Sequence, residues 1–176
     1  WGLNDGDIAV LHRGLPNQLL ARSWNALRSR YPQRRLKLLL LDDDPRDTAP
    51  GALADSLQVE AADAASLATL MASTDLLLLA QPGAVADGMV LQALASGLGI
   101  VAFDQGAAAQ HIRHGHNGAL ALPDDADSFA TATTWLLEDP ETLRRIRLNA
   151  RQYAGRHSWS NISQHLEGYL CSACAS

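Results

Sequence analysis

Short apolar runs alternate along the chain with longer segments in which apolar residues recur every three or four positions. The short runs predict β-strands at 8–11, 36–41, 57–59, 76–80, 100–103 and 118–122. The longer segments predict helices from Pro16 to Tyr31, around 67–71, and at 88–95, 107–113, 127–137, 140–153 and 159–170. The runs 36–41 and 76–80 are almost uninterrupted, which indicates strands covered by helices on both faces.

Alternation of strands and helices is typical of a parallel sheet wound with helices. We therefore predict an α/β domain with a Rossmann-like parallel sheet flanked by helices, followed by a helical C-terminal extension. The length of 176 residues fits one domain with a sizeable core. We place the sheet domain at 1–158 and a final helix and tail at 159–176.

The charge pattern argues against nucleic acid as a partner. The net charge is −5, and no stretch of the sequence is basic enough to follow a phosphate backbone. The longest apolar runs are far shorter than the roughly 20 residues that a membrane-spanning helix needs. The chain begins with Trp1 instead of Met, so we expect it to be part of a longer protein. Cys171 and Cys174 form a Cys-x-x-Cys tail without a second ligand pair, and we interpret them as reduced thiols of a cytoplasmic protein.

Metal and hydrolase chemistry are not favoured by the candidate residues. Asp42–Asp44 follow a buried strand and could hold a divalent ion, but the first strand offers no acidic partner, and a solvated turn is the preferred interpretation. His111, His114 and His116 are close in sequence, yet no fourth zinc ligand follows at a recognisable spacing. Ser96 lacks the G-x-S-x-G pattern of a nucleophile elbow. We therefore expect no metal or other cofactor.

Three segments and the far end of the chain match sequence motifs of one family. Residues 91–102 read LQALASGLGIVA, 104–112 read DQGAAAQHI, and 114–120 read HGHNGAL. They resemble, in order, the L-E-A-[ML]-A-x-G-x-P-V-V-A, x-x-G-G-x-x-E-x-I and x-G-x-N-G-x-L motifs of the retaining GT-B glycosyltransferases of group 1, the family-4 type. Ser158-Trp159 and Tyr169 are similar to the end of that family's final helix. The matches cover about 75–169 and occur in the family's order.

This resemblance implies the C-terminal half of a two-domain GT-B enzyme. Such a half binds a nucleotide-diphospho-sugar, and the sugar passes to an acceptor such as a glycan, a lipid-linked sugar or a polysaccharide. The expected partner is an N-terminal domain of the same protein, against which 159–176 would pack. The resemblance places the protein in the cytoplasm, with membrane association at the inner face through that other domain. We expect the isolated half to be inactive.

In sheets of this type, ligands lie beyond the carboxyl ends of the strands. That rule selects the loops at 13–18, 42–47, 81–88 and 104–109. Backbone amides at a helix N-terminus and a nearby cation suit a diphosphate. The resemblance gives a predicted donor-binding set of Arg13, Gln18, Gly88, Met89, Val90, Leu91 and Gln92. We also expect the small residues Ala95 and Gly97 to let their helix lie close to the sheet.

Several positions depart from the family's motifs. Gln92 stands where a glutamate holds the ribose, Ala84 where another contacts the sugar, Gln18 where a lysine binds phosphate, and Gln110 in place of the acid of G-G-x-x-E. An amide accepts a hydrogen bond less strongly than a carboxylate. Two hypotheses follow: a divergent enzyme that uses main-chain amides and Arg13, or a degenerate GT-B-like module that serves as a scaffold or interaction domain.

Overall fold

The computed structural model describes residues 2–4, 6–41, 53, 56–81, 87–158, 160–161, 163–164 and 167, with Asp87 described in its backbone only. Several predictions concern residues outside this set. They are the acidic loop at 42–47, Ala84, Cys171 and Cys174, and most of the helix expected at 159–170.

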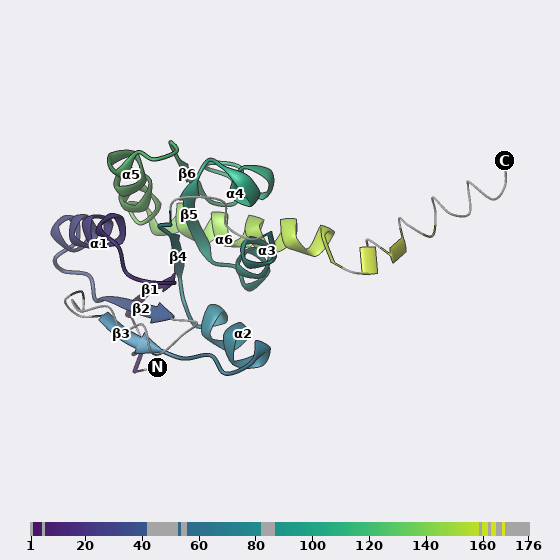
Figure 1. Cartoon of the computed structure of the whole chain (residues 1–176), viewed down its shortest axis with the longest axis horizontal. Helices are drawn as coiled ribbons and strands as arrows, with labels where there is room; N and C mark the ends of the chain where they lie inside the picture. The colour runs from purple at the N-terminus through teal and green to yellow at the C-terminus, as the bar shows by residue number, and fades with distance from the viewer. Residues whose placement is uncertain are drawn as a thin grey trace.

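The described residues form one sheet of six parallel strands, which confirms the predicted parallel sheet, and its strand order is β3-β2-β1-β4-β5-β6 (Figure 1). The strands are β1 (Ile8–Arg13), β2 (Leu36–Leu41), β3 (Ser56–Val59), β4 (Leu76–Leu79), β5 (Gly99–Phe103) and β6 (Ala119–Ala121). The helices are α1 (Gln18–Arg30), α2 (Ala64–Ala72), α3 (Asp87–Ser96), α4 (Gly106–His111), α5 (Ala126–Leu136) and α6 (Pro140–Arg156).

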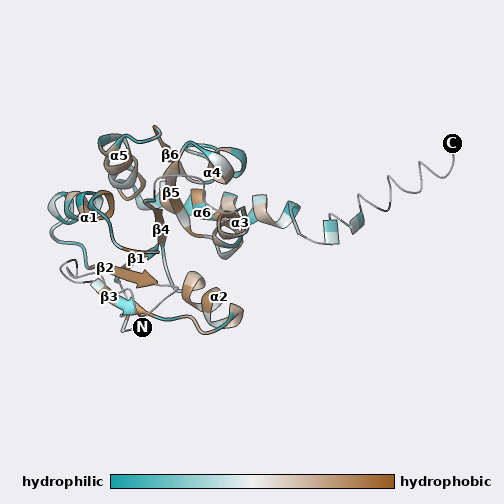
Figure 2. Ribbon diagram, viewed as in Figure 1, coloured by the Kyte–Doolittle hydropathy of each residue, from teal (hydrophilic) through white to brown (hydrophobic). Residues whose placement is uncertain are grey.

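Both faces of the sheet are buried, which explains the continuous apolar runs in its strands (Figure 2). Successive side chains of a strand point to opposite faces. In β1, Ala9 and Leu11 join the core beneath α2, α3 and α4, whereas Val10 joins the core beneath α1 and α5. Trp24 and Phe129 fill that second core and are fully buried. No helix in the described part of the chain is long and apolar enough to cross a membrane.

The start of α1 differs from the prediction that Pro16 opens this helix. The N-cap is Asn17, whose side chain accepts a hydrogen bond of 2.8 Å from the amide of Leu20, so the helix begins at Gln18. Asparagine at this position satisfies an amide that the first helical turn leaves without a partner. The Asn17 side chain also donates to the carbonyl of Ala80 at the end of β4. The cap therefore also joins α1 to a neighbouring strand.

The expectation that Ala95 and Gly97 bring α3 close to the sheet was wrong. Ala95 is exposed, and the alanine of α3 that is fully buried against the sheet is Ala93. Gly97 ends the helix with a φ of +72°, and a Cβ there would collide with the side chain of Arg151 instead of the sheet. A glycine does permit close approach of another helix, α6: a Cβ on Gly99 in β5 would lie 2.7 Å from Leu143 of α6.

Helix α6 packs against both cores at the edge where the strands begin. Its Ala150 joins one core and its Ile146 joins the other. Arg147 donates to the carboxylate of Asp75, just before β4, and to the carbonyl of Gly97. The second carboxylate oxygen of Asp75 accepts from the amide of Ala9 in β1. These bonds fix α6 at the N-terminal edge of the sheet and leave the opposite edge to the loops.

Candidate functional site

The strand order reverses direction between β1 and β4. From β1 the chain proceeds to β2 and β3 on one side, and it then crosses back to β4, β5 and β6 on the other. In open α/β sheets, the crevice beyond the carboxyl ends of the strands at such a switch point is where ligands bind. Here the switch point lies between Arg13, the last residue of β1, and the segment that leads from β4 to α3.

Hydrogen bonds hold the two chain segments at the switch point together. The Gln81 side chain donates to the carbonyl of Arg13 at 3.0 Å. Gly14 follows with a φ of +101°, and a Cβ at this position would lie 1.9 Å from Nε2 of Gln81. Glycine is therefore required for both the turn and the close approach. The Asn17 cap, through Ala80, forms a second link between the same segments.

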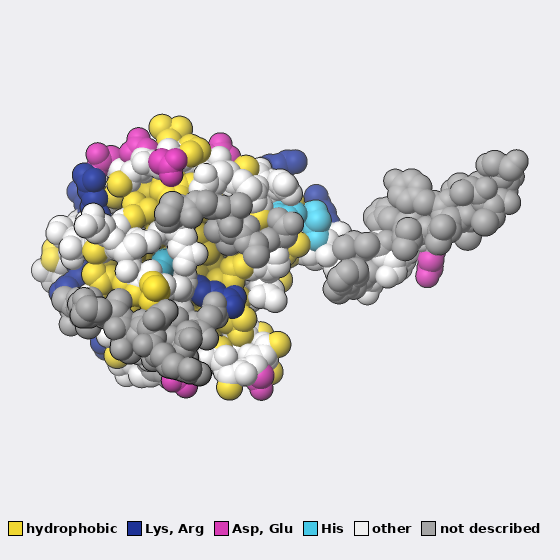
Figure 3. All heavy atoms as spheres, viewed as in Figure 1, with side chains coloured by type: hydrophobic (Ala, Val, Ile, Leu, Met, Phe, Trp, Pro, Cys, Tyr) yellow, Lys and Arg dark blue, Asp and Glu magenta, His cyan; other side chains and the backbone are white. Residues whose placement is uncertain are grey.

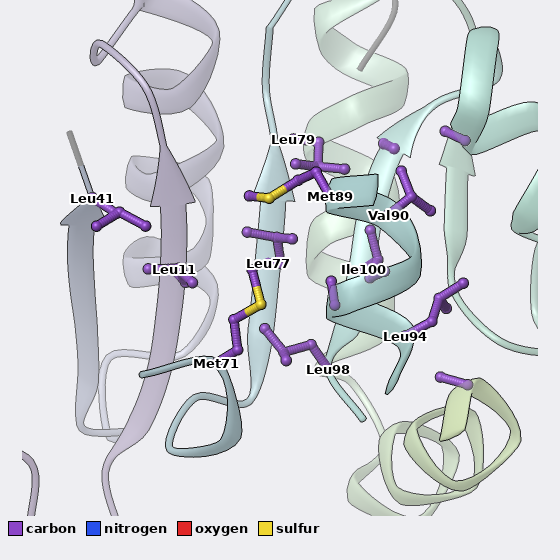
Figure 4. Packing of buried hydrophobic residues seen from close by; sticks show 14 of the residues in the cluster. Leu11, Leu41, Met71, Leu77, Leu79, Met89, Val90, Leu94, Leu98 and Ile100 are labelled. Carbon is purple, nitrogen blue, oxygen red and sulfur yellow. The ribbon is translucent and has the colours of Figure 1, made fainter. Parts of the chain in front are cut away.

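Arg13 reaches the start of α3. Its Nη1 lies 3.4 Å from Sδ of Met89. As the fifth residue after Ile8 in β1, Arg13 shares the face of Ala9 and Leu11, which is the face that α3 covers. Met89 is 7% exposed and packs beside Leu79 at the end of β4 (Figure 4). A partly buried guanidinium thus lies beside the first turn of the helix.

Helix α3 begins at Asp87, which decides which amides are open to a ligand. The amides of the first turn have no carbonyl four residues earlier within the helix. Gly88 and Met89 belong to that turn, whereas the Leu91 amide stands opposite the carbonyl of Asp87 in regular helical geometry. The position of a Cβ on Gly88 meets no atom within 4 Å, so the space beside it is open.

The other predicted residues occupy different parts of the same edge. Gln18 is exposed as the first residue of α1, and Gln92 is exposed in the second turn of α3. The side chain of Val90 is fully buried in the core, and Leu91 is partly buried. The structure thus brings Arg13 to Met89, while Gln18 and Gln92 present amide side chains to solvent.

One polar residue of this region was not recognised from the sequence. His12 is fully buried next to Arg13, and its Nδ1 lies 2.8 Å from the carbonyl oxygen of Leu78. Its Nε2 has no hydrogen-bond partner among the described residues. Burial lowers the pKa of His12 below its usual value of 6.5. A histidine inside an otherwise apolar strand is the sequence signal that could have pointed to it.

The three clustered histidines have separate partners. His111 Nδ1 lies 3.1 Å from the hydroxyl of Tyr153, and His114 stacks on Trp135 with ring centroids 5.2 Å apart. The Asn149 side chain donates to the backbone carbonyl of His116. Histidine side chains are visible where α6 leaves the domain in Figure 3. Among the described residues, no three His, Cys, Asp or Glu side chains are grouped in a way that could hold a metal ion.

The segment 114–120, which matches a family motif, has a structural role in this chain. The buried side chain of Asn117 accepts from the amide of Arg113 at 2.7 Å and donates to the carbonyl of His111 at 2.9 Å. Gly115 has a φ of +75°, and a Cβ on Gly118 would lie 3.1 Å from the carbonyl oxygen of Ile100. These residues turn the chain from α4 into β6.

A sequence model of the family described as glycosyl transferases group 1 matches residues 12–139. The chain belongs to this family. It is also 30% identical over 164 residues to a phosphatidyl-myo-inositol mannosyltransferase of Mycolicibacterium smegmatis. That match covers 90% of the chain but 40% of the relative. The group 1 chain therefore spans less than half of the curated relative it matches.

Solved structures of glycosyltransferases share the fold. The C-terminal domain of a group 1 protein from Francisella tularensis matches with a TM-score of 0.67 and 18% identity, over 85% of the chain and 84% of that domain. Sucrose-phosphate synthase from Thermosynechococcus elongatus matches with a TM-score of 0.73 and 21% identity, over 99% of the chain and 47% of the synthase. Anabaena HepE, solved in complex with UDP-glucose, matches with a TM-score of 0.66 and 21% identity, over 94% of the chain and 49% of HepE. The fold is that of a GT-B C-terminal domain.

Proposed function

We propose that this group 1 chain is the donor-binding half of a two-domain glycosyltransferase that uses a nucleotide-diphospho-sugar. The observation that carries the proposal is the contact between Arg13 and Met89 at the switch point of the sheet. A guanidinium beside first-turn amides that have no partner within the helix suits a pyrophosphate, because both charge and hydrogen-bond geometry are complementary. The UDP-glucose in the complex of the similar protein HepE supports this ligand class.

In the proposed reaction, the bond between the anomeric carbon of the sugar and the β-phosphate oxygen breaks. An acceptor hydroxyl oxygen bonds to that carbon, and the nucleoside diphosphate leaves and takes up the proton that the hydroxyl gives up. Negative charge grows on the leaving diphosphate during this step. Arg13 and the amides of Gly88 and Met89 would stabilise that charge by fixed hydrogen bonds, without a metal.

The remaining features of the proposal concern the whole protein. Transfer would take place in a cleft against an N-terminal domain, towards which 159–176 would pack, and the isolated half would bind donor without turning it over. Acceptors in the proposal are glycans, lipid-linked sugars and polysaccharides. The curated relative is a phosphatidyl-myo-inositol mannosyltransferase by name, which supports a lipid-linked acceptor. The proposed location is the cytoplasm, at the inner face of the membrane.

Nucleotide titration tests the proposal. We expect UDP, GDP or ADP to raise the melting temperature of the chain, because a ligand that binds only the folded state stabilises it by RT ln(1 + [L]/Kd). At a hundredfold excess over Kd, this amounts to about 2.7 kcal/mol. Adenosine without phosphates is the matched control and should give no shift. Absence of a shift with all three diphosphates at millimolar concentration would contradict donor binding.

The exposed amide side chains support a second candidate, a GT-B-like module that no longer transfers sugar. Gln18 and Gln92 replace the lysine and glutamate of the family motifs, and both lie at the edge where the donor would bind. A scaffold of this kind would keep the fold without nucleotide affinity. The same titration therefore separates the two candidates.

A further inference from the structure

A cavity of about 690 Å³ lies at the N-terminal edge of the sheet, beneath the first residues of β1 and beside α6. It is at the far end of β1 from Arg13, about 16 Å away at the usual rise of 3.3 Å per strand residue. Its charged lining consists of Asp7, Arg34, Arg35, Asp75, Arg144, Arg147 and Arg151. Five arginines thus face two aspartates, away from the proposed donor site.

A second cavity of about 670 Å³ adjoins the first and shares Arg34 and Arg35 with it. It adds Arg28 and Lys37, and no acidic residue is among its described lining. Counting described residues, the two cavities are lined by seven of the chain's fourteen Lys and Arg residues and two of its nineteen Asp and Glu residues. A chain with a net charge of −5 therefore gathers half of its basic residues at one edge.

Some of these arginines have a structural role. Arg34 donates to the carbonyl of Leu137 after α5, Arg151 to that of Ser96 in α3, and Arg147 to that of Gly97. Cations are favourable near helix C-termini, where carbonyls lack intrahelical partners. Capping accounts for these three arginines.

Capping does not account for the rest of the basic lining. Arg144 is exposed on α6 and has no hydrogen-bond or ion-pair partner among the described residues. It lies one turn from Arg147 and two turns from Arg151, so the three share one face of the helix. Across the cavity, Arg35 uses Nε to pair with Asp7. Arginine side chains from α6 and from the segment just before β2 thus line the same cavity.

We propose that the two adjoining cavities form a binding site for a small phosphate compound with several negative charges. Guanidinium groups match phosphate oxygens through paired hydrogen bonds. The volumes fall in the range of small-molecule sites, and a concave surface suits a compact ligand better than a flat membrane. The site is separate from the proposed donor pocket and does not depend on it.

The test measures the affinity of the 176-residue chain for sodium tripolyphosphate, the probe, by isothermal titration calorimetry. A group 1 C-terminal domain has been crystallised by itself, so the chain can be studied as it stands. We expect binding that Arg144→Glu weakens about tenfold or more, since a charge-assisted contact is replaced by repulsion. Arg145→Glu is the matched control, because Arg145 is an exposed neighbour on α6 outside both cavities, and it should change the affinity less than about twofold.

Tripolyphosphate contains the pyrophosphate group that suits the proposed donor site, so the comparison of Arg144→Glu with Arg145→Glu is repeated in an Arg13→Ala background. The loss of affinity caused by Arg144→Glu should persist there, and unchanged circular dichroism should show that the Arg144→Glu variant is folded. The proposal is overturned if the probe does not bind, if Arg145→Glu weakens it as much as Arg144→Glu, or if Arg13→Ala abolishes it. Sedimentation of the chain with phosphatidylglycerol vesicles, without affinity for tripolyphosphate, would also overturn it in favour of a membrane surface.

Discussion

The Arg13 guanidinium nitrogen lies 3.4 Å from the Met89 sulfur, although 76 residues separate them in the chain. The contact exists because β1 and β4 are neighbours at the switch point of the sheet and because Arg13 faces α3. Met89 has its side chain in the core, which holds the first turn of α3 in place beside the arginine. The packing of Met89 in the core thus places the Arg13 guanidinium beside the N-terminus of α3.

Replacing Arg13 by alanine should weaken nucleoside diphosphate binding about tenfold or more. A hydrogen bond to a charged group contributes about 1.5–3 kcal/mol. The Arg13 guanidinium lies beside the first turn of α3, where the phosphates are proposed to bind. Calorimetric titration with the nucleotide that stabilises the wild type gives the ratio of dissociation constants. Arg22→Ala on the exposed face of α1 is the control and should bind normally. Equal affinity of wild type and Arg13→Ala would remove Arg13 from the site.

Gln92→Glu should increase the affinity for a nucleotide that carries a ribose. A carboxylate accepts hydrogen bonds from the ribose hydroxyls about twice as strongly as an amide does, which corresponds to a gain of roughly three- to tenfold. The exposed position of Gln92 in α3 tolerates the added charge. Calorimetric titration measures the gain in affinity. Gln152→Glu is the control, because Gln152 is an exposed residue of α6. A Gln92→Glu variant that binds no better than the control would place the ribose elsewhere.

The fold could be predicted from the sequence because each strand or helix has its own pattern of apolar residues, either a short continuous run or a repeat every three or four positions. Leu36–Leu41 is apolar at every position but Lys37, which only a strand between two helical layers allows. The family resemblance placed Arg13 with the start of α3, and in the structure the strand order brings these two segments together. The start of α1 was misplaced because Pro16 and the Asn17 cap are adjacent, and both are helix-start signals.

Other contacts between distant segments could not be predicted. The first cavity brings Arg35, just before β2, together with Arg144 from α6. Each lies in a segment with several basic residues, but nothing in either segment indicates that the two line one cavity. The contact of the Gln81 side chain with Gly14 depends on how two loops run beside each other. The sequence of neither loop predicts that arrangement. The period of apolar residues indicates which face of one strand or helix is buried. The contacts of Arg35 with the cavity and of Gln81 with Gly14 depend instead on how separate strands, helices and loops pack together.

Gly14→Ala should destabilise the chain. The positive φ strains an L-residue, and the added Cβ would displace the Gln81 side chain, so we expect a loss of about 1–3 kcal/mol in the free energy of unfolding. Urea denaturation measures it. Gly155→Ala is the matched control, because that helical position is open and alanine is favoured there by up to about 1 kcal/mol. The double variant Gly14→Ala/Gln81→Ala should recover part of the loss, and failure to do so would assign the whole effect to the backbone.

His12 should make the stability of the chain fall as the pH drops through about 6.5. Burial lowers the pKa of its imidazole below 6.5 in the folded state, so the unfolded chain binds more protons as the pH falls through that value. The free energy of unfolding then decreases by up to about 1.4 kcal/mol per pH unit until the folded pKa is reached. The lowered pKa values of Asp7, Asp63 and Asp139 act in a separate window below pH 4, since their usual value is 3.8. Urea denaturation of His12→Gln at several pH values should show a flatter profile than the wild type or exposed His116→Gln, and an unchanged slope would mean that His12 is protonated in the folded chain.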